Sequence, residues 1–197
     1  MRVERTSLLI LVLICWIAAL CCADERVPLG VEFTSPDSRY SVHLEELGGL
    51  TYFVIKDRQT QRLNHSIIMP TAVLYLHWAS DSNSFVTVEH ISKGSYGRVI
   101  YRDKLKWKNV EVKPPYEGTM DSSVIGLQLG SEMVHYKFAV TKLTADWKPF
   151  NYWFCDVNVQ LKTGKVINVK WTPISESELS ASLWPHLPIY IPPMVYQ

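Results

Sequence analysis

Apolar and polar side chains alternate along most of residues 27–174, and short clusters of Gly, Pro, Asn, Asp and Ser interrupt the alternation at close intervals. Successive side chains of a strand point to opposite faces, so this period of two predicts β-strands, and the interruptions predict tight turns. β-Branched and aromatic residues are enriched in the same runs, as strands require. The predicted strands are residues 31–33, 40–45, 51–56, 72–78, 85–90, 97–101, 104–112, 124–129, 134–143, 153–160 and 166–171.

The clearest predicted hairpin lies around residue 163. Residues 162–165 combine Lys, Thr and Gly, and they separate two alternating apolar runs, residues 157–161 and 166–169. A short turn that contains glycine between two such runs is typical of a β-hairpin. We therefore expect these two strands to pair in antiparallel fashion.

Helical signals are confined to the C-terminal part of the chain. Ser175 and Glu178 form a capping box ahead of an apolar run, and Pro185 would end the helix. Prolines keep residues 187–196 extended. This tail is too apolar for a free solvated end, so we expect it to pack along the domain, with insertion into a partner's groove as the alternative. Residues 175–197 are thus predicted to be a short helix and a Pro-rich extended tail.

A pattern recurs at the start of two predicted strands. Residues 35–42 (SPDSRYSV) return in altered form as residues 79–86 (ASDSNSFV), a spacing within the period of about 40–45 residues of a propeller blade. Each copy continues through a strand, a turn and another strand, as far as residues 57–61 in the first unit and 98–103 in the second. Residues 155–165 form a third, partial copy.

This pattern resembles the WD40-like β-propeller repeat of exported bacterial proteins, in which an SPDG turn opens a strand and an hxDxxTG turn closes the hairpin. Ser38 stands where the family's glycine is usual, and the second copy lacks the proline. The resemblance implies blade-like antiparallel meanders. A closed ring usually needs about four or more blades, and residues 24–174 are barely long enough for three to four. We therefore predict an all-β domain over residues 24–174, an irregular sandwich or sheet stack of antiparallel meanders followed by one short C-terminal helix. A small or incomplete β-propeller is the alternative.

Residues 1–23 have the three parts of a secretory signal peptide. A basic start precedes the apolar run of residues 8–20, and small side chains at Cys21 and Ala23 precede a cleavage site. The apolar run is shorter than the roughly 20 residues of a membrane-spanning helix. We expect cleavage and export to the periplasm or the extracellular space. An uncleaved membrane anchor, or a lipoprotein modified at Cys21 or Cys22, is the alternative.

The charge balance of the chain disfavours two classes of partner. The protein has 20 basic and 19 acidic side chains, and the predicted signal contains Arg2, Arg5 and Glu4, so the mature chain is formally neutral. Nucleic-acid binding draws its affinity from an excess of Lys and Arg that neutralises phosphates. A neutral chain therefore predicts no nucleic-acid partner and gives no support for electrostatic attachment to an anionic membrane.

Of the four cysteines, all but Cys155 lie in the predicted signal. The mature chain would then form no internal disulfide and no cysteine-based metal site. Cys155 stands in an apolar run, which favours a buried structural thiol. A nucleophile or an intermolecular disulfide is the alternative.

The sequence matches none of the usual catalytic templates. G-x-S-x-G, H-E-x-x-H, G-x-G-x-x-G and P-loop motifs are absent. His43 and Glu45 share one face of a predicted strand, which could serve acid–base chemistry, although an exposed ion pair explains them equally well. No residue spacing suggests a metal site, and we predict no metal and no cofactor. The histidines are scattered over the chain, at His43, His65, His77, His90, His135 and His186.

Lysines alternate with apolar residues along residues 104–108. Lys104, Lys106 and Lys108 share one predicted face, opposite Leu105 and Trp107. Lysines along a strand commonly guard a sheet edge against aggregation. A docking stripe for an acidic partner is the functional alternative.

Aromatic residues are the most unusual feature of the predicted mature chain. Exposed aromatic rings can act as flat platforms for sugars, whereas buried ones fill the core of a sheet. The predicted ligand-binding residues are Trp147, Tyr152 and Trp153, which surround a loop-like Pro149 and Asn151, together with Trp107. Core filling is the alternative for each of them.

The sequence therefore predicts an exported all-β domain that acts as a non-catalytic binding or protein-interaction module. Its partner would be another envelope or extracellular protein or a polysaccharide. Asn64 begins a glycosylation sequon, which matters only in a eukaryote. The alternative is a small extracytoplasmic hydrolase, or an enzyme accessory, with a site that includes His43 and Glu45. A purely structural envelope component is a third possibility.

Overall fold

The prediction of an all-β chain with one short C-terminal helix is confirmed. The computed structural model describes residues 26–69, 72–91, 94–116, 120–146 and 148–183. The predicted signal and the Pro-rich tail lie outside the described residues. The elements are β1 (Phe33–Thr34), β2 (Tyr40–Leu47), β3 (Leu50–Asp57), β4 (Arg62–Met69), β5 (Ala72–Trp78), β6 (Ser84–Ile91), β7 (Gly94–Asp103), β8 (Lys106–Val112), β9 (Met120–Leu129), β10 (Met133–Leu143), β11 (Pro149–Gln160), β12 (Val166–Ile174) and α2 (Glu176–Leu183).

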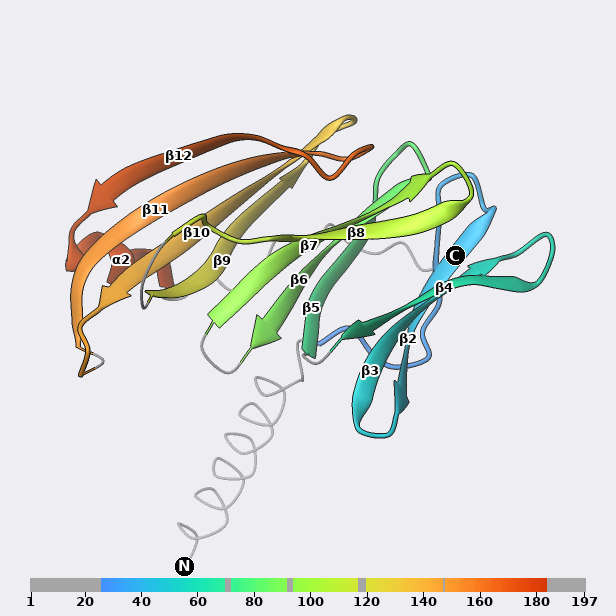
Figure 1. Ribbon diagram of the computed structural model, residues 1–197, viewed down its shortest axis with the longest axis horizontal. Coiled ribbons are helices and arrows are strands. Elements are labelled where there is room, and N and C mark those ends of the chain that lie inside the picture. Colours follow the sequence, from blue (N-terminus) through green and yellow to red (C-terminus); the bar gives the residue numbers. More distant parts are fainter. Residues whose placement is uncertain (1–25, 70–71, 92–93, 117–119, 147, 184–197) are drawn as a thin grey trace, which may run out of the picture.

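The strands form three consecutive antiparallel meanders (Figure 1). The first meander, β1–β4, is a separate four-stranded sheet. The second, β5–β8, and the third, β9–β12, belong to one eight-stranded sheet. The two are joined where β7 and β9 pair in parallel, with Gly94 opposite Ser122. The predicted sheet stack thus consists of three meanders; the relation to WD40-like repeats stays a prediction.

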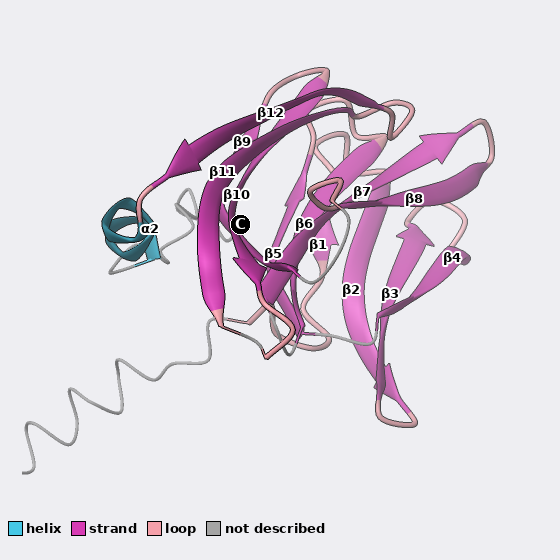
Figure 2. Ribbon diagram, turned by 60° about the vertical axis from the view of Figure 1, so that its left-hand side comes forward, coloured by secondary structure: helices cyan, strands magenta, loops and turns pink. Residues whose placement is uncertain are grey.

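The second meander is the middle layer of the molecule, with the first meander on one side and the arching third meander on the other (Figure 2). Its alternating side chains enter two different cores. Phe85 and Ile100 pack with Tyr40, Phe53 and other residues of the first meander. Val86 and Val99 pack against the third meander, whose core residues are Val124, Val134, Tyr136, Phe138, Val140, Cys155, Val157 and Val159. Burial on both faces explains why β6 and β7 are apolar over much of their length.

A hydrogen-bonded ion pair is buried within this middle layer. The Arg98 guanidinium donates to both carboxylate oxygens of Glu89, from Nε at 2.9 Å and from Nη2 at 3.1 Å. Thr87 donates to the same carboxylate, and Arg98 also donates to Asn109 and Tyr96. Burial alone would lower the pKa of Arg98, but the hydrogen bond and charge of Glu89 raise it.

The observed strands differ from the predicted ones at several places, and three of these differences have a plain cause. The strand β4 was not predicted, because its segment is rich in polar residues; β4 lies at the edge of its sheet, where such residues are tolerated. The predicted strand 104–112 begins later, at Lys106, because Lys104 adopts a φ of 57° in the turn between β7 and β8. β11 begins at Pro149, within the predicted loop.

The C-terminal helix begins as the capping box predicts. Ser175 Oγ accepts the amide of Glu178 at 3.2 Å, and the Glu178 carboxylate accepts the amide of Ser175 at 2.7 Å. The helix α2 contacts β11. Within the described ranges, no helix has the length and apolar character needed to cross a membrane.

Candidate functional site

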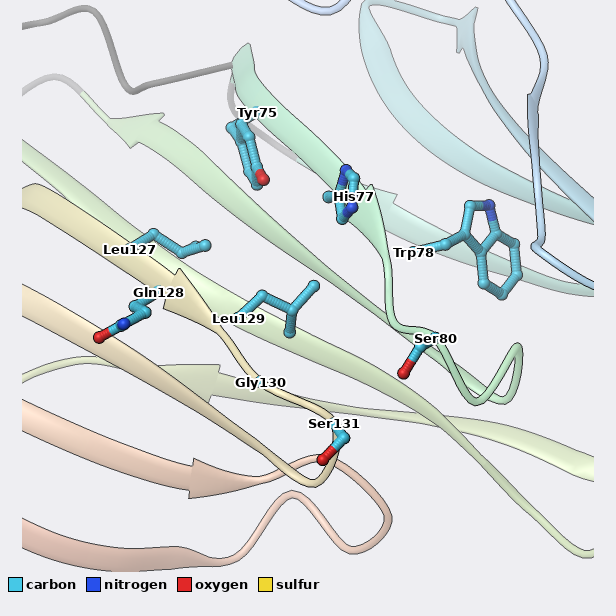
Figure 3. Close-up of a pocket in the computed structure, with 9 residues that line it drawn as sticks. All are labelled: Tyr75, His77, Trp78, Ser80, Leu127, Gln128, Leu129, Gly130 and Ser131. Atoms are coloured by element: carbon cyan, nitrogen blue, oxygen red, sulfur yellow. The ribbon is translucent and has the colours of Figure 1, made fainter. Parts of the chain in front are cut away.

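A pocket of about 440 Å³ lies between the edge strand β5 and the turn that joins β9 to β10 (Figure 3). Tyr75 and His77 line it from β5, and Leu127 and Leu129 lie across from them on β9 (Figure 3). Such a volume suits a small ligand, since ligand pockets usually measure about 300–1,000 Å³. The complete lining is Tyr75, His77, Trp78, Ser80, Leu127, Gln128, Leu129, Gly130 and Ser131.

A β-bulge in β5 sets which side chains face the pocket. The register between β5 and β6 shifts between Val73 and Tyr75, so that Leu74 is the extra residue. Val73 therefore packs in the core beside the first meander, whereas Tyr75, two residues later, packs in the core beside the third. Without the bulge, residues two apart would share a face. The bulge thus places Tyr75 and His77 on the pocket side.

Polar and apolar atoms contribute about equally to the pocket surface, and the lining carries no described charged side chain at neutral pH. The rings of Tyr75 and His77 stack with centroids 6.1 Å apart and an interplanar angle of 21°. Desolvation lowers the pKa of His77 below its usual value of 6.5 and raises the pKa of Tyr75 above 10.0. Both groups are therefore uncharged at neutral pH. The hydroxyls of Ser80 and Ser131 lie at one end of the pocket and add two further hydrogen-bonding groups (Figure 3).

The histidine in the pocket should titrate below its usual pH. We expect the Cε1–H resonance of His77 to give an NMR titration midpoint below 6.5 in the folded protein, and a midpoint near 6.5 in urea. Because the unfolded state then takes up the proton first, this group lowers the stability of the fold as pH falls from 6.5 through the folded-state pKa. A folded-state midpoint at or above 6.5 would contradict the desolvation that lowers the pKa of the imidazole.

The predicted pair of His43 and Glu45 does form. His43 Nε2 lies 2.7 Å from Glu45 Oε1, on the face of the first meander that points away from the middle layer. A second pair joins His135 and Asp156 at 2.9 Å on the third meander. Over the described parts of the chain, no group of three or more His, Cys, Asp or Glu side chains could hold a metal ion.

Of the predicted ligand-binding residues that the structure describes, Trp107 is not brought together with Tyr152 and Trp153. Trp107 is a correction: its side chain is only 4% exposed and packs in the core between the first and second meanders. It therefore cannot act as an exposed platform, and Leu105, predicted to share its face, lies exposed in the preceding turn. Lys106 and Lys108 do point outward from the edge strand β8.

The predicted aromatic segment is partly exposed, but its rings do not form a flat platform. Tyr152 and Trp153 are half-buried on β11. Trp153 meets Trp171 edge to face, with an interplanar angle of 86°. Trp147 lies outside the described residues. Burial and the nearby Glu176 carboxylate raise the pKa of Tyr152.

The structure also places the remaining cysteine of the predicted mature chain. Cys155 is fully buried in the core beside the third meander. Burial raises the pKa of its thiol to about 12, with a smaller contribution from Asp156. Such a thiol is protonated at neutral pH, so it is not poised to act as a nucleophile.

The sequence did not reveal the pocket because its residues look like ordinary strand residues. Tyr75, Leu127 and Leu129 fit the alternation of core positions, and only the bulge in β5 and the packing of the meanders bring them around a shared space. The strand position predicted for His77 was the one available signal. No protein-family model matches the chain, and the comparison with curated proteins found no match.

Proposed function

We propose that this protein is a non-catalytic binding module that acts outside the cytoplasm and holds a small, neutral, largely apolar ligand in the pocket between β5 and β9. The observation that carries the proposal is the pocket itself. Leucine and tyrosine side chains line it together with hydroxyl, amide and imidazole groups, and the side chains of the lining are uncharged at neutral pH. Binding sites for small molecules commonly combine apolar walls with a few orienting polar groups.

The chemistry of the lining limits the ligand. An ionised ligand would lose its hydration against Leu127 and Leu129 without gaining a charged partner in the lining. A planar or branched apolar body fits beside the stacked rings of Tyr75 and His77, and one polar group can meet the Ser80 or Ser131 hydroxyl. The signal-like N-terminus supports the proposed location outside the cytoplasm.

Two observations favour binding over hydrolysis. The pair formed by His43 and Glu45 lies on the outer face of the first meander, and neither residue lines the pocket. The pocket lining contains one histidine and no carboxylate. General acid–base hydrolysis needs at least a positioned base with a nucleophile or an activated water beside it.

The neutral apolar dye N-phenyl-1-naphthylamine tests the proposal. We expect saturable fluorescence enhancement with the native protein and about tenfold weaker binding by Leu129→Gln, since the change removes roughly 1–2 kcal/mol of apolar contact. The matched control is Leu63→Gln, because the Leu63 side chain is 68% exposed and lies outside the pocket. Circular dichroism should show that both variants remain folded.

Two results would contradict the proposal. The first is an absence of saturable binding by the native protein. The second is equal weakening by Leu129→Gln and Leu63→Gln, which would show that the dye adheres to exposed surface rather than to the pocket.

A further inference from the structure

The turns of the first two meanders gather at one end of the molecule, on the right of Figure 1. They are residues 35–39, 58–61, 79–83 and 104–105, and they include the repeated sequence pattern. Direct hydrogen bonds join them. The Asp37 amide donates to Ser82 Oγ at 2.9 Å, and the Arg102 amide donates to the Asn83 carbonyl at 2.8 Å.

Basic side chains outnumber acidic ones at this end, although the predicted mature chain is neutral. The excess creates a local positive potential that attracts anions. The acidic residues are Asp37, Asp57, Asp81 and Asp103, and the basic ones are Arg39, Arg58, Arg62, Arg102, Lys104, Lys106 and Lys108.

Two of these arginines flank one buried tyrosine. The guanidinium carbon of Arg39 lies 5.1 Å from the centre of the Tyr40 ring, and that of Arg102 lies 5.2 Å from it. The Trp107 ring meets the same tyrosine edge to face, with centroids 5.4 Å apart. Two cations and the Trp107 ring therefore all contact the Tyr40 ring, between the first meander and β7–β8.

Three hydrogen-bonding atoms of this cluster are buried without a partner. They are the Tyr40 hydroxyl, the Trp107 indole Nε1 and the Arg39 Nε. Tyr40 is 1% exposed and Trp107 is 4% exposed, so solvent does not reach these rings. An indole N–H and a guanidinium N–H can only donate. Leaving a buried donor unsatisfied costs about 1–3 kcal/mol, so each calls for an acceptor.

The nearby carboxylates do not hydrogen-bond to the unpaired donors, although Asp57 lies at ion-pair distance from Arg39. Asp57 Oδ2 stays 4.0 Å from Arg39 Nε, while Oδ1 accepts the amides of Gln59 and Thr60. Asp103 pairs with Lys108. Over the described part of the chain, no carboxylate lies within ion-pair distance of Arg102. Among the described residues, no group within hydrogen-bond distance supplies the missing acceptors.

We propose that Arg39, Tyr40, Arg102 and Trp107 form a binding site for an oxyanion, a phosphate or sulfate group. Such a group offers several acceptor oxygens and a negative charge, which match the unpaired donors and the two guanidiniums. The Arg39 side chain is 42% exposed, so it is reachable from solvent. None of these residues lines the β5–β9 pocket, so the site is independent of the proposed ligand pocket.

The indole N–H resonance of Trp107 provides the test. Purified ¹⁵N-labelled protein is titrated with sodium phosphate or sodium sulfate, with sodium chloride at equal ionic strength as the reference, and Trp107→Phe assigns the peak. We expect a saturable shift of the Trp107 resonance with an oxyanion and none with chloride. The tighter-binding oxyanion identifies which of the two groups the site prefers.

Two variants separate a built site from a general positive field. Arg102→Gln should weaken binding by about tenfold or more, because a hydrogen bond to a charged group contributes about 1.5–3 kcal/mol. Arg58→Gln removes the same charge from an exposed position at the same end and should change the binding constant by less than about threefold, since salt screens exposed charges.

The proposal is overturned if the Trp107 resonance does not respond to either oxyanion. Buried water would then be the acceptor for the unpaired donors. The proposal is also overturned if Arg58→Gln weakens binding as much as Arg102→Gln does. Neither result bears on the dye-binding test of the pocket.

Discussion

Replacing Arg98 by methionine is expected to lower the free energy of unfolding by about 3–5 kcal/mol. The Glu89 carboxylate is completely buried in the middle layer and receives two hydrogen bonds from the Arg98 guanidinium. Among the described residues, removing the guanidinium leaves the buried charge with the Thr87 hydroxyl as its hydrogen-bond partner. Urea denaturation followed by circular dichroism measures the loss.

A double variant separates two contributions to the free energy of unfolding: that of the intact ion pair, and the destabilisation caused by removing one partner alone. Arg98→Met combined with Glu89→Leu should recover most of the lost stability, because buried ion pairs are often replaceable by apolar side chains of similar size. The remaining deficit would come from Thr87 and Asn109, which lose their hydrogen-bond partners.

The exposed pair of Lys108 and Asp103 is the matched control for this prediction. Lys108→Met also removes a cation from a hydrogen-bonded ion pair, but at the surface, where water takes over the interaction. A loss from Arg98→Met no larger than that from Lys108→Met would contradict the role assigned to the buried pair.

Replacing Gly97 by alanine is expected to destabilise the protein by about 3 kcal/mol. A Cβ atom on Gly97 would lie 2.2 Å from Cε1 and 2.5 Å from Cζ of Tyr136. The Tyr136 ring cannot move aside, because it is fully buried and its hydroxyl donates to the carbonyls of Arg98 and Thr87, at 3.0 and 3.2 Å. The contact fixes how closely the third meander packs on the second.

Gly126 on β9 provides the control for the change from glycine to alanine at Gly97. In Gly126→Ala, the new Cβ would meet Lys137 Cβ at 3.5 Å, an ordinary contact, so we expect a change within about 1 kcal/mol. In a Tyr136→Leu background, Gly97→Ala should also cost less than about 1 kcal/mol, because the ring is gone. Equal losses from the two glycine variants in the native background would contradict the packing argument.

Local signals in the sequence predicted much of the strand order correctly. The strand over residues 72–78 has the predicted bounds, and the hairpin around residue 163 pairs as expected. Ser175 and Glu178 begin the helix as their capping pattern predicts. These features depend on side chains a few residues apart, so the sequence contains the information needed to predict them.

The alternation of apolar and polar residues did not predict which face of a strand is exposed to solvent. Trp107 and the flanking lysines alternate as predicted, but the first meander covers the tryptophan and turns a predicted platform into core. Phe85 and Val86 are adjacent and both fully buried, because the middle layer has a core on each side. Burial of this kind depends on which sheet packs against which, and that is decided by contacts between distant segments.

The sequence by itself therefore determined the all-β class, most turns, the start of the helix and the apolar surroundings of Cys155. Each of these follows from the pattern and chemistry of residues that are close together in the chain. Only the tertiary structure decided the two sites. The pocket requires the extra residue at Leu74 and the approach of β5 to β9. The rings of Tyr40 and Trp107, which carry unpaired donors, meet because strands from two separate sheets pack there. A shift of one residue in the strand register, or a different packing of the sheets, would change both proposed sites. The alternation in the sequence would stay the same.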